Sequence, residues 1–267
     1  MPIRLAMLDV DGTMMHRDQW NPGALDLIAL LAERGIRVAL CSGRPTGSLR
    51  TIAGQVPAIS LVAGSSGATV MARESDEDGA GWQLLGHRAL AAGVVERVLA
   101  GTDKAGIETW CYSATEWLVR SISDKIRDEE TFLGDVPVLD PVVGRDDIGK
   151  VLLLLNHSEA TAELAASINE WPGLSVVMSS DVFADVVPEI AARTKGGDLL
   201  MDHLGLGWDE VLAIGDGHND IGMLSRAGHA VAVAPLDEAS LGGSDTDHRR
   251  GSAASTLEAL ELVRGWL

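Results

Sequence analysis

The sequence has few cysteines: Cys41 and Cys111 are the only two among its 267 residues. Two cysteines cannot build the disulfide framework of a small secreted domain, and the N-terminal residues lack the charged, apolar and small-residue regions of a signal peptide. No apolar run approaches the roughly 20 residues that a membrane-spanning helix requires. We therefore expect a cytoplasmic protein that does not enter a membrane.

Positive charge is scarce as well. The chain has four lysines and a formal net charge of −18. Binding to nucleic acid or to an anionic membrane surface requires a basic region that displaces counterions, so we expect neither as a partner. A small anionic phosphate can still bind where a metal ion and a few cations gather in one cleft. The sequence leaves the oligomeric state open.

Several catalytic motifs are also absent. The sequence has no Gly-x-x-x-x-Gly-Lys loop and no Gly-x-Gly-x-x-Gly fingerprint, which disfavours nucleotide-dependent kinases and dehydrogenases. A cysteine phosphatase needs an arginine shortly after its nucleophile, but the residue six positions after Cys41 is Gly47, and six after Cys111 it is Trp117. We expect both cysteines to be buried thiols.

Apolar residues make up 46% of the chain and recur in short runs that alternate with helical patterns. A strand at residues 5–8, a helix at 22–33 and a strand at 36–41 form a βαβ pattern, which predicts a parallel sheet. The same rhythm returns with strands at 210–214 and 230–234. The predicted fold class is α/β, with a Rossmann-like, doubly wound parallel-sheet core.

The middle of the chain has a different pattern. Residues 84–187 combine helices with pairs of neighbouring strands, an α+β layout in which the strands are expected to be antiparallel. We predict that this segment is an α+β cap domain inserted into a core made of residues 1–83 and 188–267. Residues 238–251 are polar and rich in glycine, and they are predicted as a loop.

An acid pair ends the first apolar strand. The sequence Asp-x-Asp-Gly-Thr at residues 9–13 places Asp9 and Asp11 on the same side of the backbone if the strand continues through Asp9. Two like charges this close resist joint ionisation unless a cation lies between them or one keeps its proton. Both arrangements suit phosphate chemistry, although Asp-Gly also forms simple turns.

Two further apolar strands end in polar turns, Ser-Gly-Arg at residues 42–44 and Gly-Asp-Gly-His-Asn-Asp at residues 215–220. The carboxyl ends of parallel strands line the ligand-binding crevice of an open α/β sheet, so we expect these turns and the acid pair to meet in space. Arg44 is expected either near the substrate or in a structural ion pair. His218 is expected to be a turn residue that faces the cleft or solvent, because Mg²⁺ prefers oxygen ligands.

Together these segments resemble the motifs of the haloacid dehalogenase-type phosphohydrolase superfamily. The matching features are residues 9–13, the hydroxyl of Ser42, Lys195 at the start of a predicted helix at 195–204, and residues 215–220. The insertion between Ser42 and Lys195 resembles the Cof-type branch with an α+β cap of the second class (C2). The resemblance implies a phosphatase that acts on a small phosphorylated metabolite, with a sugar or polyol phosphate expected.

The resemblance also implies a role for each residue. Asp9 would be the nucleophile that forms an aspartyl-phosphate, and Asp11 would be the general acid and base. Mg²⁺ would bind the carboxylates of Asp9 and Asp216 and the backbone carbonyl of Asp11, with Asp220 behind them or joined through water. The phosphate oxygens would be bound by Gly12, Ser42, Gly43, Lys195 and Asn219.

Two other functions stay open at this point. One is a phosphotransferase or mutase that passes the phosphoryl group to a sugar, and the other is a regulatory protein that binds phosphate without turnover. The chain departs from the family pattern at Gly-Ser-Ser-Gly (residues 64–67), where Asn-Gly is expected, and at Ala234-Pro235, where Asn-Ala is typical. In the cap, the candidates for facing the cleft are Arg120, Lys125, Arg127 and Asp185.

Overall fold

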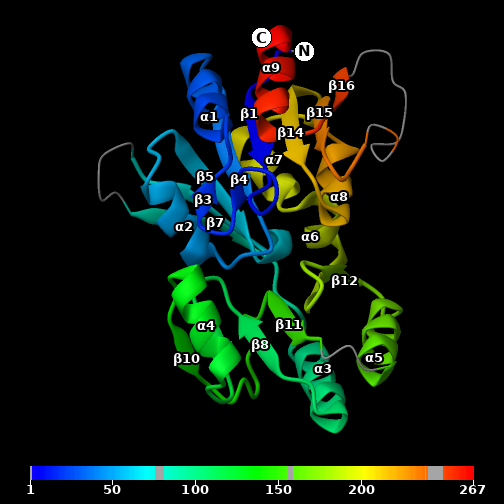
Figure 1. Ribbon diagram of the computed structural model, residues 1–267. Helices are drawn as coiled ribbons and strands as arrows, with labels where there is room; N and C mark the ends of the chain where they lie inside the picture. Colours follow the sequence, from blue (N-terminus) through cyan, green and yellow to red (C-terminus); the bar gives the residue numbers. More distant parts are fainter. Residues whose placement is uncertain (1, 76–80, 156–158, 238, 240–248) are drawn as a thin grey trace.

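The computed structural model describes residues 2–75, 81–155, 159–237, 239 and 249–267. These residues form an eight-stranded sheet, a six-stranded sheet and a two-stranded ribbon of β2 (Met15–His16) and β3 (Gln19–Trp20). The six-stranded sheet and its helices lie below the eight-stranded sheet in Figure 1. Within the described residues, no helix combines the length and the apolar character needed to cross a membrane.

The eight-stranded sheet has the order β16-β15-β14-β1-β4-β5-β6-β7. Its strands from β16 to β5 run parallel, and β6 and β7 are antiparallel additions at one edge. The central parallel strands confirm the predicted sheet. The strands are β1 (Leu5–Leu8), β4 (Arg37–Cys41), β5 (Ile59–Gly64), β6 (Thr69–Arg73), β7 (Trp82–His87), β14 (Val211–Gly215), β15 (His229–Val233) and β16 (Arg249–Ala253).

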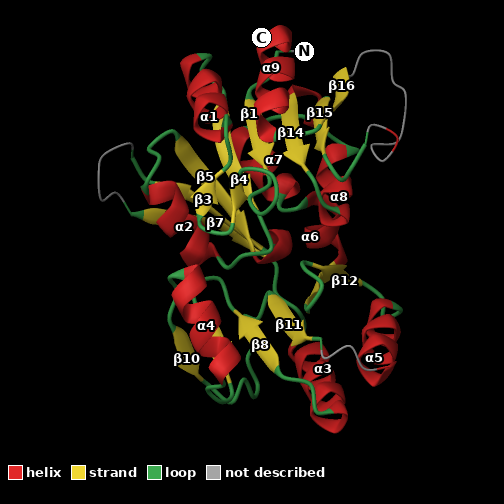
Figure 2. Cartoon of the chain, in the orientation of Figure 1, coloured by secondary structure: helices red, strands yellow, loops and turns green. Residues whose placement is uncertain are grey.

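Helices cover both faces of this sheet, as Figure 2 shows. Successive side chains of a strand point to opposite faces, so Ala6 and Leu8 of β1 belong to one apolar cluster and Leu5 and Met7 to another. Both faces of β1 are therefore buried, which explains its unbroken apolar run. The first cluster is covered by α1 (Ala24–Glu33), α2 (Thr46–Gly54) and α9 (Thr256–Trp266), and the second by α7 (Gly197–Leu204) and α8 (Ile221–Leu224).

The six-stranded sheet has the order β10-β9-β8-β11-β13-β12, and its pairs are antiparallel except β9 with β10. Apolar residues of α3 and α5 pack on one face, and those of α4 join an aromatic cluster on the other. The elements are α3 (Ala92–Ala105), β8 (Thr109–Tyr112), β9 (Trp117–Val119), α4 (Asp124–Leu133), β10 (Pro137–Leu139), β11 (Lys150–Leu154), α5 (Glu159–Asn169), β12 (Leu174–Met178) and β13 (Phe183–Pro188).

The structure differs from the sequence predictions at some boundaries. Strand β7 continues to His87 and pairs with β6, so residues 84–87 belong to the eight-stranded sheet. Strand β16 falls partly within residues 238–251, which were predicted as a loop, while 238 and 240–248 lie outside the described residues. Its sequence Arg-Arg-Gly-Ser-Ala has no apolar pattern, and its pairing with the buried strand β15 makes it a strand.

Candidate functional site

The three polar turns lie together because the strands that precede them are neighbours. Strand β1 lies between β14 and β4 in the sheet. The backbone N–H of Asp9 still donates to the Ile214 carbonyl at 2.9 Å, so Asp9 leaves β1 beside the end of β14. The turns at 9–13, 42–44 and 216–220 thus lie side by side at the carboxyl ends of these three central strands.

Lys195 joins two of these acids. Its ammonium donates to Asp9 Oδ1 at 2.6 Å and also contacts Asp220 Oδ1, and all three side chains are buried. The helix predicted from residue 195 begins only at Gly197. Lys195 instead follows the short helix α6 (Glu189–Thr194) with φ +49°, and Gly196 follows with φ +81°. These two left-handed residues separate α6 from α7 at the lysine that contacts the acids.

The turn at 216–220 is held by Asp220. Its Oδ2 accepts hydrogen bonds from the backbone N–H groups of Asp216 at 3.1 Å and Gly217 at 2.9 Å. The Thr13 hydroxyl donates to Asp216 Oδ1 at 2.6 Å, across 203 residues of sequence. A Cβ atom at Gly12, where φ is +91°, would collide with the Asp216 carboxylate. Glycine and threonine after the acid pair therefore allow the first turn to approach Asp216 closely.

Asp9, Asp216 and Asp220 form an acidic trio in which each offers one carboxylate oxygen within 4.8 Å of the others. Burial and the charge of Asp220 raise the pKa of Asp9, while burial raises the pKa of Asp216. Burial alone would lower the pKa of Lys195, but the charges of Asp220 and Asp9 outweigh it and raise that pKa. Three carboxylates around one ammonium leave an excess of negative charge, and a hard divalent cation with oxygen ligands fits this donor set.

Asp11 has a different partner. Arg44 donates to both of its carboxylate oxygens, from Nε at 2.7 Å and from Nη2 at 2.5 Å. The Arg44 side chain is 7% exposed and that of Asp11 is 48% exposed. The Arg44 guanidinium also lies 4.5 Å from the ring centroid of Phe132 on α4. Arg44 is thus in an ion pair at the site and in contact with the second sheet's helix.

A cavity of about 630 Å³ lies between the two sheets. On the side of the eight-stranded sheet it is lined by Asp9, Asp11, Arg44, Pro45, Asp216 and Gly217, and by Ser42, Gly43, His218 and Asn219. The Ser42 hydroxyl oxygen accepts the N–H of Arg44 at 3.2 Å. Gly12, Lys195 and Asp220 are not among the described residues that line the cavity, and the ammonium of Lys195 lies behind Asp9.

The other wall of the cavity was not predicted from the sequence. It consists mainly of aromatic and apolar side chains: Trp110, Tyr112, Phe132, Leu133, Leu152, Met178 and Phe183, together with Glu129, Lys150, Ser179, Ser180 and Asp181. The sequence did contain one signal for this wall. Trp110 and Tyr112 are two positions apart on β8, and residues with this spacing lie on the same face of a strand. Among the described lining residues none of the four cap candidates appears, and Arg120 instead pairs with Asp103 at 2.7 Å.

Asp185 belongs to a buried junction between the sheets. The Lys150 ammonium donates to the Gly43 carbonyl at 2.8 Å and to Asp185 Oδ2 at 3.3 Å, and the Ser66 hydroxyl donates to the same Oδ2 at 2.6 Å. Burial lowers the pKa of Lys150. Ser66, with φ +55°, lies where Asn-Gly was expected, so this departure supplies a hydroxyl to the junction. At the other departure, the Ala234–Pro235 peptide is cis.

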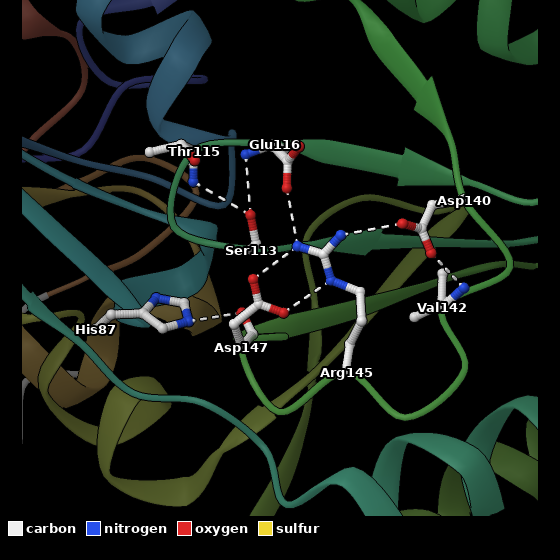
Figure 3. Close-up of polar contacts among 8 residues, drawn as sticks. All are labelled: His87, Ser113, Thr115, Glu116, Asp140, Val142, Arg145 and Asp147. Carbon is white, nitrogen blue, oxygen red and sulfur yellow. Dashed lines mark hydrogen bonds and ion pairs between the residues drawn. The ribbon is translucent and has the colours of Figure 1, made fainter.

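A second junction surrounds Arg145 (Figure 3). Arg145 donates to Asp147 from Nε at 2.8 Å and from Nη2 at 2.6 Å, and it also binds Glu116 at 2.8 Å. His87, the last residue of β7, bonds through Nε2 to the Asp147 carbonyl at 3.0 Å. Its Nδ1 lies 2.8 Å from the Thr69 hydroxyl. Burial lowers the pKa of His87.

The family model described as haloacid dehalogenase-like hydrolase matches residues 6–239. Phosphoglycolate phosphatase from Aeropyrum pernix is 31% identical over 114 residues, which cover 43% of this chain and 47%, about half, of that protein. HMP-PP phosphatase from Citrobacter koseri is 24% identical over 235 residues, which cover 86% of this chain and 84% of that protein.

A solved structure also matches the fold. It is BT4131, described as a sugar phosphatase of subclass IIB of the haloacid dehalogenase superfamily, with a TM-score of 0.79, 18% identity and coverage of 98% of each chain. At this identity the match concerns the fold alone. It confirms the predicted fold class, a Rossmann-like core with an added cap.

Proposed function

This chain belongs to the haloacid dehalogenase-like hydrolases, and from that premise we propose that it is a Mg²⁺-dependent phosphatase of a small phosphorylated metabolite. The observation that supports this most directly is the cluster of Asp9, Asp216, Asp220 and Lys195, of which Asp9 and Asp216 line a cavity large enough for a small molecule. The names of two relatives also support it, since one is a phosphoglycolate phosphatase and the other an HMP-PP phosphatase.

In this proposal Asp9 is the nucleophile. Its carboxylate attacks phosphorus in line and forms an aspartyl-phosphate while the bond to the leaving alcohol breaks, and water then hydrolyses this intermediate. Lys195 supports the role because its ammonium, 2.6 Å from Asp9 Oδ1, favours the ionised carboxylate and orients it. The Ser42 hydroxyl, Asn219 and the backbone N–H group of Gly43 would donate to the phosphate oxygens. The predicted donor at Gly12 is less suited, because its N–H already donates to the Met15 carbonyl at 2.8 Å.

Mg²⁺ would be held by the carboxylates of Asp9 and Asp216 and by the Asp11 carbonyl, and when bound it supplies positive charge to the phosphoryl oxygens. Asp220 is a weaker candidate for a direct ligand. Both of its oxygens already accept hydrogen bonds, Oδ1 from Lys195 and Oδ2 from the backbone at Asp216 and Gly217. We therefore propose that Asp220 positions Lys195 and the turn at 216–220 and does not bind the metal directly.

Asp11 is proposed to protonate the leaving alcohol and later to take a proton from the attacking water. Its position in the same cavity as Asp9 supports this. Arg44 binds both oxygens of Asp11 and so favours the carboxylate form that receives the proton. To act as an acid, Asp11 must exchange at least one of these two hydrogen bonds for the leaving group.

We also propose the division into a core and an inserted cap. The pairing of β7 with β6 supports a first boundary after His87, and the pairing of β13 with β11 and β12 supports a second one near Pro188. The cavity between the two sheets is consistent with a cap that covers the reacting groups and excludes water.

The proposal is tested by replacing the nucleophile. Asp9→Asn should lower phosphate release from p-nitrophenyl phosphate by about a thousandfold or more, because an amide cannot form the aspartyl-phosphate. EDTA should abolish wild-type hydrolysis and added Mg²⁺ should restore it. Asp26→Asn, an exposed acid on α1, serves as the matched control. Wild-type rates in Asp9→Asn would overturn the proposal, and transfer of phosphate to an added sugar in place of water would indicate a phosphotransferase.

A further inference from the structure

The chain is poor in aromatic residues, yet the cavity is rich in them. The sequence has seven tryptophans, one tyrosine and two phenylalanines. The single tyrosine, both phenylalanines and Trp110 line this one cavity, on the wall formed by the six-stranded sheet and α4. Building on the function proposed above, we propose that this wall binds a planar aromatic ring, and that the substrate is the phosphate ester of an aromatic or heteroaromatic alcohol.

The rings form a packed wall. Trp110 lies against Phe183 with ring centroids 5.4 Å apart and an angle of 55° between the planes. Trp117 supports the wall from behind, 5.4 Å from Trp110 and stacked 6.2 Å from Tyr112. Such tilted and stacked contacts fix the orientation of each ring, so a planar ligand meets a surface that is already organised for aromatic contact.

Three polar groups beside the rings have partners within the protein. The Trp110 indole N–H donates to Glu108 at 2.7 Å, and the Lys150 ammonium donates to Gly43 and Asp185. Glu129 pairs with Lys125 at 2.9 Å. A sugar carries a hydroxyl on nearly every carbon, and a buried hydroxyl without a hydrogen-bond partner is destabilising. The wall therefore favours a flat apolar ring over the sugar or polyol predicted from the sequence.

One cavity contains both the groups proposed to bind the phosphate and the rings proposed to bind the rest of the substrate. Asp9, Asp11 and Ser42 lie at one wall and the aromatic rings at the other, within a single volume of about 630 Å³. A phosphate bound beside Asp9 places its ester substituent toward the rings. The cavity size is in the range of small-molecule sites.

The first test compares three esters of primary alcohols, so that the leaving groups have similar reactivity: benzyl phosphate, cyclohexylmethyl phosphate and glucose 6-phosphate. With Mg²⁺ present, kcat/KM for benzyl phosphate should exceed the other two by about tenfold, the effect of one favourable aromatic contact. Glucose 6-phosphate used as well as benzyl phosphate would overturn the inference. An equal kcat/KM for cyclohexylmethyl phosphate and benzyl phosphate would also overturn it, because the wall would then select apolar groups without preferring aromatic ones.

The second test changes the wall. Phe183→Leu and Phe132→Leu should each raise KM for benzyl phosphate several-fold more than they raise KM for glucose 6-phosphate. Phe132 is 42% exposed, so its replacement carries little risk of misfolding. Trp171→Leu is the matched control, because Trp171 packs on Arg97 in the same cap and does not line the cavity. Equal losses for both esters in the phenylalanine variants would count against the inference.

A binding measurement separates this inference from the phosphatase proposal. 2-Phenylethylphosphonate and 2-cyclohexylethylphosphonate mimic two of the esters but cannot be hydrolysed, and calorimetry measures their affinities without turnover. Preference for the phenyl compound in a protein that hydrolyses nothing would support the aromatic site and overturn the phosphatase. Hydrolysis of esters with equal affinity for both phosphonates would overturn the aromatic site alone.

Discussion

The chain has four lysines, and two of them, Lys195 and Lys150, are each only 2% exposed. Lys195 lies in the core site between Asp9 and Asp220, whose charges outweigh burial and raise its pKa. Lys150 lies in the cap, where burial outweighs the attraction of Asp185 and lowers its pKa. One lysine compensates a surplus of carboxylates, and the other joins the cap to the core. If the proposed function is correct, the same residue type serves chemistry in one region and assembly in the other.

The two walls of the cavity, one from the core and one from the cap, also differ in the side chains that they present. The core wall is mainly polar and charged, whereas the cap wall is mainly aromatic and apolar with a few polar residues among the rings. We infer that reaction type belongs to the core and choice of leaving group to the cap. Three predictions test the contrast between the catalytic site of the core and the contacts that join the cap to it.

The largest effect is expected at the core lysine. Lys195→Met should lower kcat by about a hundredfold to a thousandfold, because it removes a buried donor beside the nucleophile and leaves Asp9 and Asp220 facing each other. Phosphate release measures the loss, and circular dichroism checks that the variant is folded. Lys104→Met, at an exposed position on α3, is the control. If Lys195→Met kept the wild-type kcat, the contrast between the two lysines would disappear.

The cap lysine should act on stability. Lys150→Met leaves Asp185, which has no exposed surface, without its cation, and should lower the free energy of unfolding by about 3 kcal/mol. Urea unfolding measures this difference. The comparison is Arg264→Met, which breaks an exposed ion pair with Glu261 and should change stability by less than about 1 kcal/mol.

A double variant sharpens this second prediction. Replacing Asp185 by Leu in the Lys150→Met background removes the unpaired carboxylate and should recover much of the lost stability. Equal stability of Lys150→Met and Arg264→Met would show that the buried pair does not hold the cap to the core.

The smallest effect concerns pH at the second junction. Burial lowers the pKa of His87 below its ordinary value of 6.5, so the unfolded chain binds a proton more readily than the folded one. The stability that neutral His87 provides is complete above pH 6.5 and is lost as pH falls through the folded pKa. The melting temperature should therefore fall more between pH 7.5 and pH 5.5 in the wild type than in His87→Gln. An equal drop in both proteins would exclude this contribution.

The strands and turns of the core could be predicted because their signals are local. Apolar runs buried on both faces are visible in the sequence, and the polar turns at their carboxyl ends follow from the rule for open α/β sheets. Strand β16 was missed because its residues have no apolar pattern of their own. The left-handed backbone at Lys195 was missed for a similar reason, since packing and contacts with distant acids select it.

The sequence by itself determined the parallel core and the family to which the chain belongs, because both depend on order along the chain and on residue type. Only the tertiary structure decided that Asp11 pairs with Arg44, that Lys150 and Asp185 join the two sheets, and that scarce aromatic residues from separate elements share one wall. These contacts join residues far apart in sequence, and the geometry that selects them exists only once both sheets are packed together.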